Sequence, residues 1–217
     1  MKLEGFTWYR QSAFGFQGDG LSVYIDPWGM PDDAPPADAV FITHAHFDHF
    51  QKDDIAKVTK EGTALVAPRD VADELSGNVT AVVAGDSIEV AGVRAEAVPA
   101  YNIIEGREGH PKEKGWVGYV LTLGDQTIYH AGDTDHLPEL GAISARAAFV
   151  PIGGAGFTMD VAEAARLVLD INPQVAVPMH YGFVEGCAGP MAAYEFRKAC
   201  EPVEVQVFEP ISHFEFE

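Results

Sequence analysis

One short run of the chain gathers side chains that bind metals. The run is Thr43-His44-Ala45-His46-Phe47-Asp48-His49, which places four candidate ligands within six residues and uses three of the chain's eight histidines. Imidazole and carboxylate groups are the usual ligands of zinc and related transition metals. A polar, histidine-rich loop without metal is the plainer alternative, and the density of ligands argues against it.

The spacing of these ligands predicts a loop after a strand. In a strand His44 and His46 share a face, but Asp48 and His49 cannot both follow them there. We therefore expect the apolar strand to end near Ile42 and to open into a loop. Such a loop can aim two ligands at one point and two at a neighbouring point. Two metal ions about 3.5–4 Å apart, with a shared water, require this arrangement.

Two later segments have a similar design. The segment 126–134 predicts a strand that runs into a tight turn, where Gly132 frees the backbone and Asp133 is presented just past the strand end. The segment 175–182 predicts a short strand followed by His180. Each is weak alone, since a Gly-Asp turn is usually only a turn and a lone histidine is more often structural.

Together these segments resemble the metallo-β-lactamase-fold superfamily. His-Ala-His-Phe-Asp-His matches its His-x-His-x-Asp-His motif, and Asp133 and His180 follow in the order and approximate positions of the family's later ligands. The resemblance implies an α/β fold, the four-layer αββα sandwich. Further segments look like the ascorbate-6-phosphate-lactonase-like branch of uncharacterised hydrolases: Asp26-Pro27-Trp28, Val98-Pro99-Ala100-Tyr101-Asn102, Gly115-Trp116-Val117-Gly118-Tyr119, Tyr129-His130-Ala131-Gly132-Asp133-Thr134 and Pro178-Met179-His180-Tyr181-Gly182.

The chain departs from the superfamily pattern at one ligand. The family usually places a histidine where this chain has Tyr101 and Asn102, and neither side chain is a good zinc ligand beside imidazole. His110, eight residues after Asn102, is our candidate for that position because neutral imidazole is the commonest ligand of its kind. The alternative is an open or single-metal first site. Residues 102–115 are charged and glycine-rich, so they predict either a functional loop or a plain solvated one.

The resemblance implies a division of the ligands between two ions. His44, His46 and His110 would hold the first ion, Asp48, His49 and His180 the second, and Asp133 would bridge them. We expect two divalent transition-metal ions, zinc in first place with manganese or iron as alternatives. The catalytic residues would be Asp48, which can accept the proton of the attacking water, and the bridging Asp133.

This site predicts a metal-dependent hydrolase that uses a metal-activated hydroxide on a small-molecule ester, lactone, amide or phosphoester. The branch resemblance favours a small, phosphorylated or cyclic metabolite. Two other functions stay open: an iron-dependent oxidative enzyme on the same fold, and a non-catalytic metal-binding domain. Flavin-linked di-iron relatives carry Glu where this chain has His46, which argues against that oxidative class.

Other residues are candidates for supporting the ligands or contacting substrate. We expect Asp26 to buttress the ligand loop and His130 to make a hydrogen bond near the site rather than to bind metal. Tyr181 is interpreted either as a hydrogen-bond donor to substrate or as a packed aromatic. The loop 153–158 precedes a helix N-terminus, where an anionic substrate group could bind, or is simply a set of tight turns. The full set expected to support ligands or substrate is Asp26, Tyr101, Asn102, His130 and Tyr181.

The remaining polar candidates are assigned no catalytic role. His136 and His213 are expected at the surface. Cys187, seven residues after His180, is interpreted as a small apolar turn residue in preference to a metal ligand. With Cys200 as the other cysteine, the chain offers no disulfide framework, and a reducing compartment would leave both as thiols.

Composition limits the function classes. The length of 217 residues fits a single domain, residues 1–217. The formal net charge of −19 repels phosphate backbones, so we expect no nucleic-acid partner. We see no signal peptide or membrane-spanning stretch, and we expect a cytoplasmic protein with a small-molecule substrate and no membrane partner. Assembly into a homo-oligomer stays open.

Apolar periodicity and turn signals predict the elements that must position the ligands. A helix begins near Asp53, a second runs from an Asp70 cap to Leu75, and a third begins at an Asp160–Glu163 capping box and ends before Pro173. A last helix is expected near 190–200. Strands are expected at 6–10, 21–26, 38–43, 63–67, 79–83, 86–90, 92–98, 116–123, 126–130, 147–151, 175–179 and 203–207.

Overall fold

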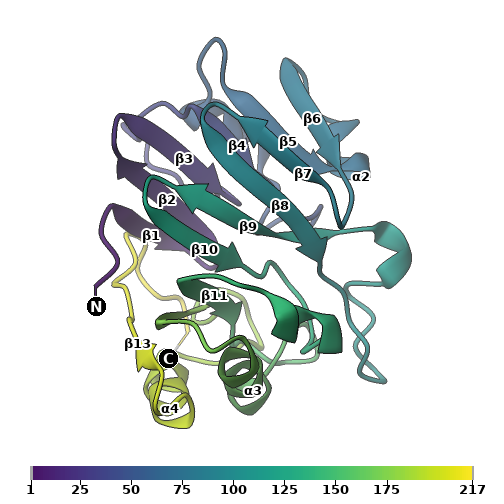
Figure 1. Ribbon diagram of the computed structural model, residues 1–217, viewed down its shortest axis with the longest axis vertical. Coiled ribbons are helices and arrows are strands. Elements are labelled where there is room, and N and C mark those ends of the chain that lie inside the picture. The colour runs from purple at the N-terminus through teal and green to yellow at the C-terminus, as the bar shows by residue number, and fades with distance from the viewer. Residues whose placement is uncertain (1, 217) are drawn as a thin grey trace.

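The computed structural model describes residues 2–216, and these form two mixed sheets packed face to face with helices on the outer faces (Figure 1). This is the expected αββα sandwich. A continuous apolar core lies between the sheets, and it includes the fully buried rings of Phe14, Phe41, Tyr119 and Phe149. Each buried ring of this size contributes about 1.5–3 kcal/mol through the area that it removes from water.

The first sheet follows the chain order from β1 to β6. Its first two pairings are antiparallel and the remaining ones are parallel. β4 is buried along its whole length, as expected for a parallel strand covered on both faces. The strands are β1 Phe6–Arg10, β2 Ala13–Gly18, β3 Leu21–Ile25, β4 Ala39–Phe41, β5 Ala64–Pro68 and β6 Asn78–Val82.

The second sheet has the order β13-β12-β11-β10-β9-β8-β7. β10, β11, β12 and β13 run parallel, while β7, β8 and β9 add antiparallel pairs at the other side. The strands are β7 Ser87–Val90, β8 Val93–Pro99, β9 Val117–Leu123, β10 Gln126–His130, β11 Ala147–Pro151, β12 Val175–Met179 and β13 Glu204–Val205.

Helices cover the outer face of each sheet. A second apolar cluster, with Tyr24, Val40 and Leu65 from the first sheet, packs under Ile55 of α1 and Val71 of α2. α3 and α4 lie together on the second sheet (Figure 1). The helices are α1 Lys52–Val58, α2 Arg69–Ala72, α3 Val161–Ile171 and α4 Met191–Ala199, with short 3₁₀ turns η1 Lys112–Lys114 and η2 Pro138–Ala142.

Several local expectations were wrong. The strand β2 was not predicted, because its sequence Ala-Phe-Gly-Phe-Gln-Gly carries two glycines and follows β1 closely. Asp70 is not the cap of α2: Pro68 takes that place, the helix ends at Ala72, and Asp70 Oδ2 accepts a hydrogen bond from Trp116 Nε1 at 2.9 Å. The strand expected at 203–207 spans only Glu204–Val205.

The prediction for α3 is confirmed. Asp160 accepts a hydrogen bond from the backbone N–H of Glu163, and the Glu163 side chain accepts one from the backbone of Asp160. No helix among residues 2–216 combines the length and the apolar character needed to cross a bilayer.

Candidate metal centre

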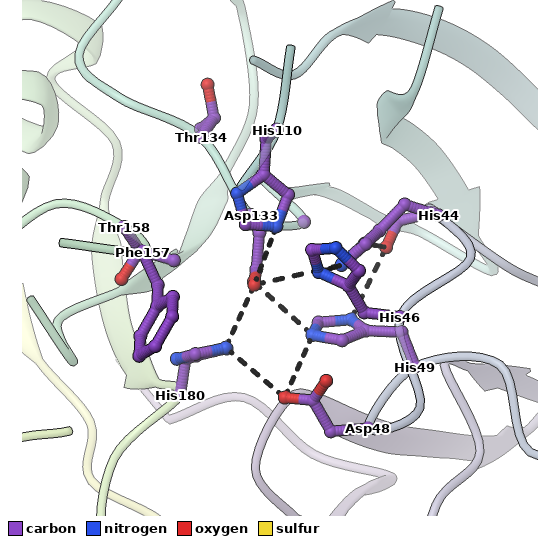
Figure 2. Close-up of polar contacts among 12 residues, drawn as sticks. His44, His46, Asp48, His49, His110, Asp133, Thr134, Phe157, Thr158 and His180 are labelled. Carbon is purple, nitrogen blue, oxygen red and sulfur yellow. Dashed lines mark hydrogen bonds and ion pairs between the residues drawn. The ribbon is translucent and has the colours of Figure 1, made fainter. Parts of the chain in front are cut away.

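The candidate ligands form two neighbouring groups (Figure 2). Within each group every member offers one ligand atom, and these atoms lie within 4.8 Å of one another. The first group is His44, His46, His110 and Asp133, and the second group is Asp48, His49 and His180. The structure therefore brings together all seven residues that the sequence predicts as metal ligands, while their binding of metal stays a prediction.

The carboxyl ends of strands position these groups. The loop after β4 carries the four ligands of the histidine-rich run, the turn after β10 carries Asp133, and His180 comes directly after β12. Gly132 adopts a left-handed φ of 62°, and a Cβ there would lie 3.0 Å from Thr43 Cβ. A larger residue at 132 would therefore push the Asp133 turn away from the ligand loop.

Asp133 lies between the two groups. Its Oδ2 is 2.9 Å from His180 Nε2 and 3.3 Å from His110 Nε2, and its Oδ1 is 3.4 Å from His49 Nε2. Figure 2 shows these rings converging on the carboxylate. A carboxylate that faces members of both groups has the placement of a bridging ligand.

Unpartnered polar atoms provide a test of whether metal ions fit. His49 Nε2, His110 Nε2 and Asp133 Oδ1 are buried and have no hydrogen-bond partner. Buried polar atoms are normally satisfied, so three unpartnered atoms within the two ligand groups indicate a missing bound species. Imidazole nitrogens and carboxylate oxygens are the donors that zinc, manganese and iron accept. The residues present therefore fit a pair of divalent ions.

The second group has a buried polar support. Asp26 Oδ2 accepts a hydrogen bond from His49 Nδ1 at 2.7 Å, which turns His49 Nε2 toward the centre. Asp26 Oδ1 accepts from the backbone N–H of Thr43 at 2.7 Å, and the Thr43 hydroxyl donates to Oδ2. The structure thus places Asp26 where the sequence expects it to buttress the ligand loop.

His180 and Asp48 are also held from outside the centre. His180 adopts a left-handed φ of 62°, and its backbone N–H donates to the Gln11 carbonyl at 3.0 Å. Gln11 Nε2 donates to Asp48 Oδ2 at 3.4 Å. Cys187 Sγ lies 3.8 Å from His180 Nδ1, the ring nitrogen that faces away from Asp133. Cys187 is thus neither in a ligand group nor a plain apolar turn residue, because its thiol contacts the back of a ligand ring.

His110 depends on a loop for its position. Asn102 Oδ1 accepts the backbone N–H of His110 at 2.9 Å and lies 3.1 Å from its Nδ1. Buried Asp135 accepts the backbone N–H groups of Ile103 and Ile104 and pairs with Arg107 at 2.7 Å. The loop 102–110 is therefore anchored, and Asn102 orients His110 in place of binding metal itself.

Two supporting residues from the sequence prediction lie elsewhere. The Tyr101 hydroxyl donates to Glu139 at 2.8 Å, so this side chain is not at the centre. Tyr181 is buried against Trp8 and Phe214, so of its two interpretations the structure favours the packed aromatic over the hydrogen bond to substrate. The strand-to-loop turns direct both side chains away from the centre.

His130 supports the backbone near the centre. Its Nε2 donates to the Ser12 carbonyl at 2.9 Å, and its Nδ1 accepts the backbone N–H of Gly132 at 3.3 Å. His130 therefore orients the turn that carries Asp133, without binding a ligand side chain. Among the remaining histidines, His136 is only partly exposed and pairs with Asp170 at 2.8 Å, whereas His213 is exposed as expected.

The imidazoles of the two groups differ in charge. Burial holds the pKa of His44 and His46 below the usual value. Burial would lower the pKa of His49 and His180 too, but nearby carboxylates, Asp133 above all, outweigh it and hold both well above the usual value. Without metal, His44 and His46 are therefore neutral, whereas His49 and His180 hold protons that a metal ion must displace.

The carboxylates complete this charge pattern. Burial acts to raise the pKa of Asp48 and Asp133, yet the facing imidazoles hold both pKa values well below the usual value. Both carboxylates are therefore ionised and ready to bind a cation. Buried charges of this kind are costly unless they are paired or coordinate a metal.

The N-terminus of α3 is occupied by the chain's own carboxylates. The first turn of α3 is satisfied by the carboxylates of Asp160 and Glu163 in the capping box. Glu163 also pairs with Arg107 at 2.8 Å. An anionic substrate group would meet these carboxylates, so the structure favours the other interpretation of loop 153–158, a set of tight turns.

Sequence reasoning missed residues that act through long-range contacts. Gln11, Thr43, Asp135 and Trp116 all support the centre, and the Trp116 ring lies 5.0 Å from the ring of His44 and 4.9 Å from that of His46. Trp116 and Thr43 stand inside motifs noted in the sequence. Gln11 and Asp135 carry no local signal, because their partners lie 37 and about 30 residues away.

Comparisons with known proteins agree with this geometry. The family model described as beta-lactamase superfamily domain matches residues 5–180. A UPF0173 metal-dependent hydrolase of Methanopyrus kandleri is 34% identical, over 96% of this chain and 98% of that protein. The solved structure of a metallo hydrolase from the archaeon Ignicoccus hospitalis is 26% identical, covers 98% of each chain and has a TM-score of 0.77.

A second solved structure is more similar in shape. It comes from Parabacteroides distasonis, is 29% identical, covers 94% of this chain and 92% of that one, and has a TM-score of 0.83. The family match and the Methanopyrus relative extend over most of the chain and include both ligand groups. The chain belongs to the beta-lactamase superfamily and, within it, to the UPF0173 metal-dependent hydrolases.

Proposed function

We propose that the protein hydrolyses a small molecule with two divalent ions, zinc in first place, held by the first and second groups. The observation that carries this proposal is the position of Asp133, which faces His49 and His180 of one group and His110 of the other. When bound, such ions lower the pKa of water toward neutrality and polarise the oxygen that gains charge during hydrolysis. The family's printed name, metal-dependent hydrolase, supports the same reaction class.

The chain's own residues then handle substrate and protons. Asp48 lines a cavity of about 280 Å³ together with His46, His110 and His180. Its Oδ2 lies 3.5 Å from His180 Nε2 and 3.6 Å from His49 Nε2, while Figure 2 shows the other oxygen free of these contacts. These contacts support the proposed role of Asp48, which is to accept the proton of the attacking water and to pass it to the leaving group.

The charge of the chain supports a small-molecule substrate. The formal net charge of −19 disfavours a polyanion such as nucleic acid. The cavity volume lies near the lower end of the ~300–1,000 Å³ typical of small-molecule sites. Candidate bonds are those of esters, lactones, amides and phosphoesters.

Replacing Asp48 by Asn tests the proposed proton transfer. Asn keeps the size and one ligand oxygen but removes the proton acceptor. We expect the Asp48→Asn variant to fold, to keep most of its metal and to lose about 10²–10⁴-fold in turnover. Turnover and metal content are measured on the same preparation. A parent-like rate would show that Asp48 only holds the scaffold.

A further inference from the structure

The cavity over the metal centre is apolar outside its ligands. Besides the candidate ligands His46, Asp48, His110, Asp133 and His180, its lining consists of four residues without charge. These four are Phe47, Gly109, Phe157 and Val184, and we call them the apolar rim. The polar chemistry of the cavity is thus confined to its floor, where a bond would be cleaved.

Two members of the apolar rim are large and exposed. Phe47 is 59% exposed and Phe157 is 42% exposed. Phe47 leans edge-on against Trp28, with ring centroids 5.7 Å apart, and the Phe157 carbonyl accepts a hydrogen bond from Asn102 Nδ2 at 3.1 Å. The Phe47 ring and the Phe157 backbone are therefore held beside the cavity, where a cluster of exposed apolar side chains indicates a binding surface.

The cations near the cavity already have partners. Arg107 pairs at 2.7 Å with Asp135 and at 2.8 Å with Glu163. Arg10, in an adjoining hollow, lies 4.0 Å over the Trp28 ring and pairs with Glu215. Within the described residues 2–216, the lining of the cavity includes no lysine or arginine. A phosphate or carboxylate tail would therefore lose water without gaining a protein cation.

The helix that points toward this region offers no compensation. The N-terminal turn of α3 is occupied by its own capping carboxylates, Asp160 and Glu163. Apart from the candidate ligands, the cavity lining is apolar, and Arg107 and Arg10 nearby are already paired with carboxylates. An extra negative charge on the substrate would therefore find no free cation in the lining.

We propose that the substrate is an uncharged ester or lactone whose short alkyl or acyl chain lies against Phe47, Phe157 and Val184. This inference rests on the proposed function. Water adds to the carbonyl carbon, the bond from that carbon to the alcohol oxygen breaks, and this oxygen takes up the proton. An ester gives a carboxylic acid and an alcohol, and a lactone gives both groups in one molecule. The apolar rim thus disfavours the phosphorylated metabolites that the branch resemblance suggests.

A matched pair of inhibitors tests the charge preference without turnover. Hexanohydroxamic acid and adipic monohydroxamic acid share the same metal-binding head and chain length, but the second ends in a carboxylate. Their affinities for zinc-loaded protein are measured by titration calorimetry. We expect the neutral compound to bind at least about ten-fold more tightly, because only its tail is stabilised by apolar burial. Equal binding, tighter binding of the carboxylate, or no binding of either compound would overturn the proposal.

Variants of the rim test the location. Phe157→Ala and Phe47→Ala should each weaken the neutral compound by about three- to ten-fold and leave the carboxylate compound within about two-fold. Leu169→Ala is the matched control, since Leu169 is 42% exposed on α3 and does not line the cavity. If the rim variants behave as this control does, the tail binds elsewhere and the proposal fails.

An activity comparison separates this proposal from the proposed function. Zinc-loaded protein is assayed with 4-nitrophenyl butyrate and with 4-nitrophenyl phosphate. Faster hydrolysis of the butyrate, reduced by Phe157→Ala, supports both ideas. Faster hydrolysis of the phosphate overturns the substrate class and leaves hydrolysis standing. If neither is hydrolysed while the inhibitor preference holds, the proposed function fails and the apolar, uncharged ligand class stands.

Discussion

The two ligand groups are held by the chain in different ways. All three members of the second group are buried: His180 directly follows β12 and is held by the Gln11 carbonyl, and His49 is held by the buried carboxylate of Asp26. In the first group His46 is only partly buried, and His110 belongs to the irregular loop between β8 and β9. A ligand held by a strand end or by a buried hydrogen bond loses little freedom on binding, whereas a ligand on a long irregular loop must be ordered.

This difference predicts that the two groups bind their ions with unequal affinity. The second group offers a pre-ordered site and should bind the tighter ion. The first group should bind the weaker ion, which depends on the anchors of loop 102–110, namely Asn102, Asp135 and Arg107. Metal exchange and any change in metal affinity on substrate binding should then affect mainly the ion of the first group.

Removing the residue shared by both groups should have the largest effect. Asp133→Ala takes away the carboxylate that faces His49, His110 and His180. We expect less than one bound ion and a loss of at least about 10³-fold in turnover, since metal ions contribute several kcal/mol to such reactions. Elemental analysis and kinetics measure this, with circular dichroism as the control for folding. Retention of two ions would mean that Asp133 does not bridge.

Residues that hydrogen-bond to a ligand ring from outside the centre should each affect the metal affinity of one group. Asn102→Ala removes the acceptor that orients His110, and Asp26→Asn removes the carboxylate behind His49. Each change should weaken the ion of its own group by about 10–100-fold and spare the other. Stepwise metal titration of the two variants makes the comparison. If both variants weaken the same ion, the division into two groups is wrong.

Proton release on metal binding should also distinguish the two groups, with a smaller effect than the substitutions above. The raised pKa values of His49 and His180 mean that both are protonated near neutral pH without metal, so the tighter ion must displace protons. Its apparent affinity should rise with pH by about ten-fold per unit and per proton until the raised pKa values are passed.

The affinity for the ion of the first group should depend little on pH. Burial lowers the pKa of His44 and His46, so they are neutral already at pH 7. Calorimetric titration in buffers of different ionisation enthalpy counts the released protons. Equal release at both steps would contradict the charge difference between the groups.

The same contrast explains what the sequence could reveal. The second group is recognisable because Asp48, His49 and His180 stand in short segments with strong strand and turn signals. His110 could be proposed only because a ligand was missing at Tyr101 and Asn102, and no local pattern places it. Its position depends on Asp135, whose hydrogen bonds to the loop exist only in the folded chain.

For the fold too, the sequence could predict only the elements that have a local signal. The long apolar strands and the capping box of α3 have local signals, and these elements were predicted close to their observed bounds. The strand β2 lacks such a signal, because Gly15 and Gly18 interrupt its pattern and pairing with β1 and β3 determines it. The sequence left two interpretations of Tyr181 open for a related reason, since packing against Trp8 decides where its ring points.

The most direct test of the two-group account is a zinc titration of metal-free protein, with His110→Ala as the paired variant. We expect the parent to bind two equivalents per chain in two steps of unequal affinity. The variant should keep the tighter step, lose the weaker one and remain folded. A parent that binds a single equivalent or none, or a variant that keeps both steps or loses the tighter one, would contradict the account.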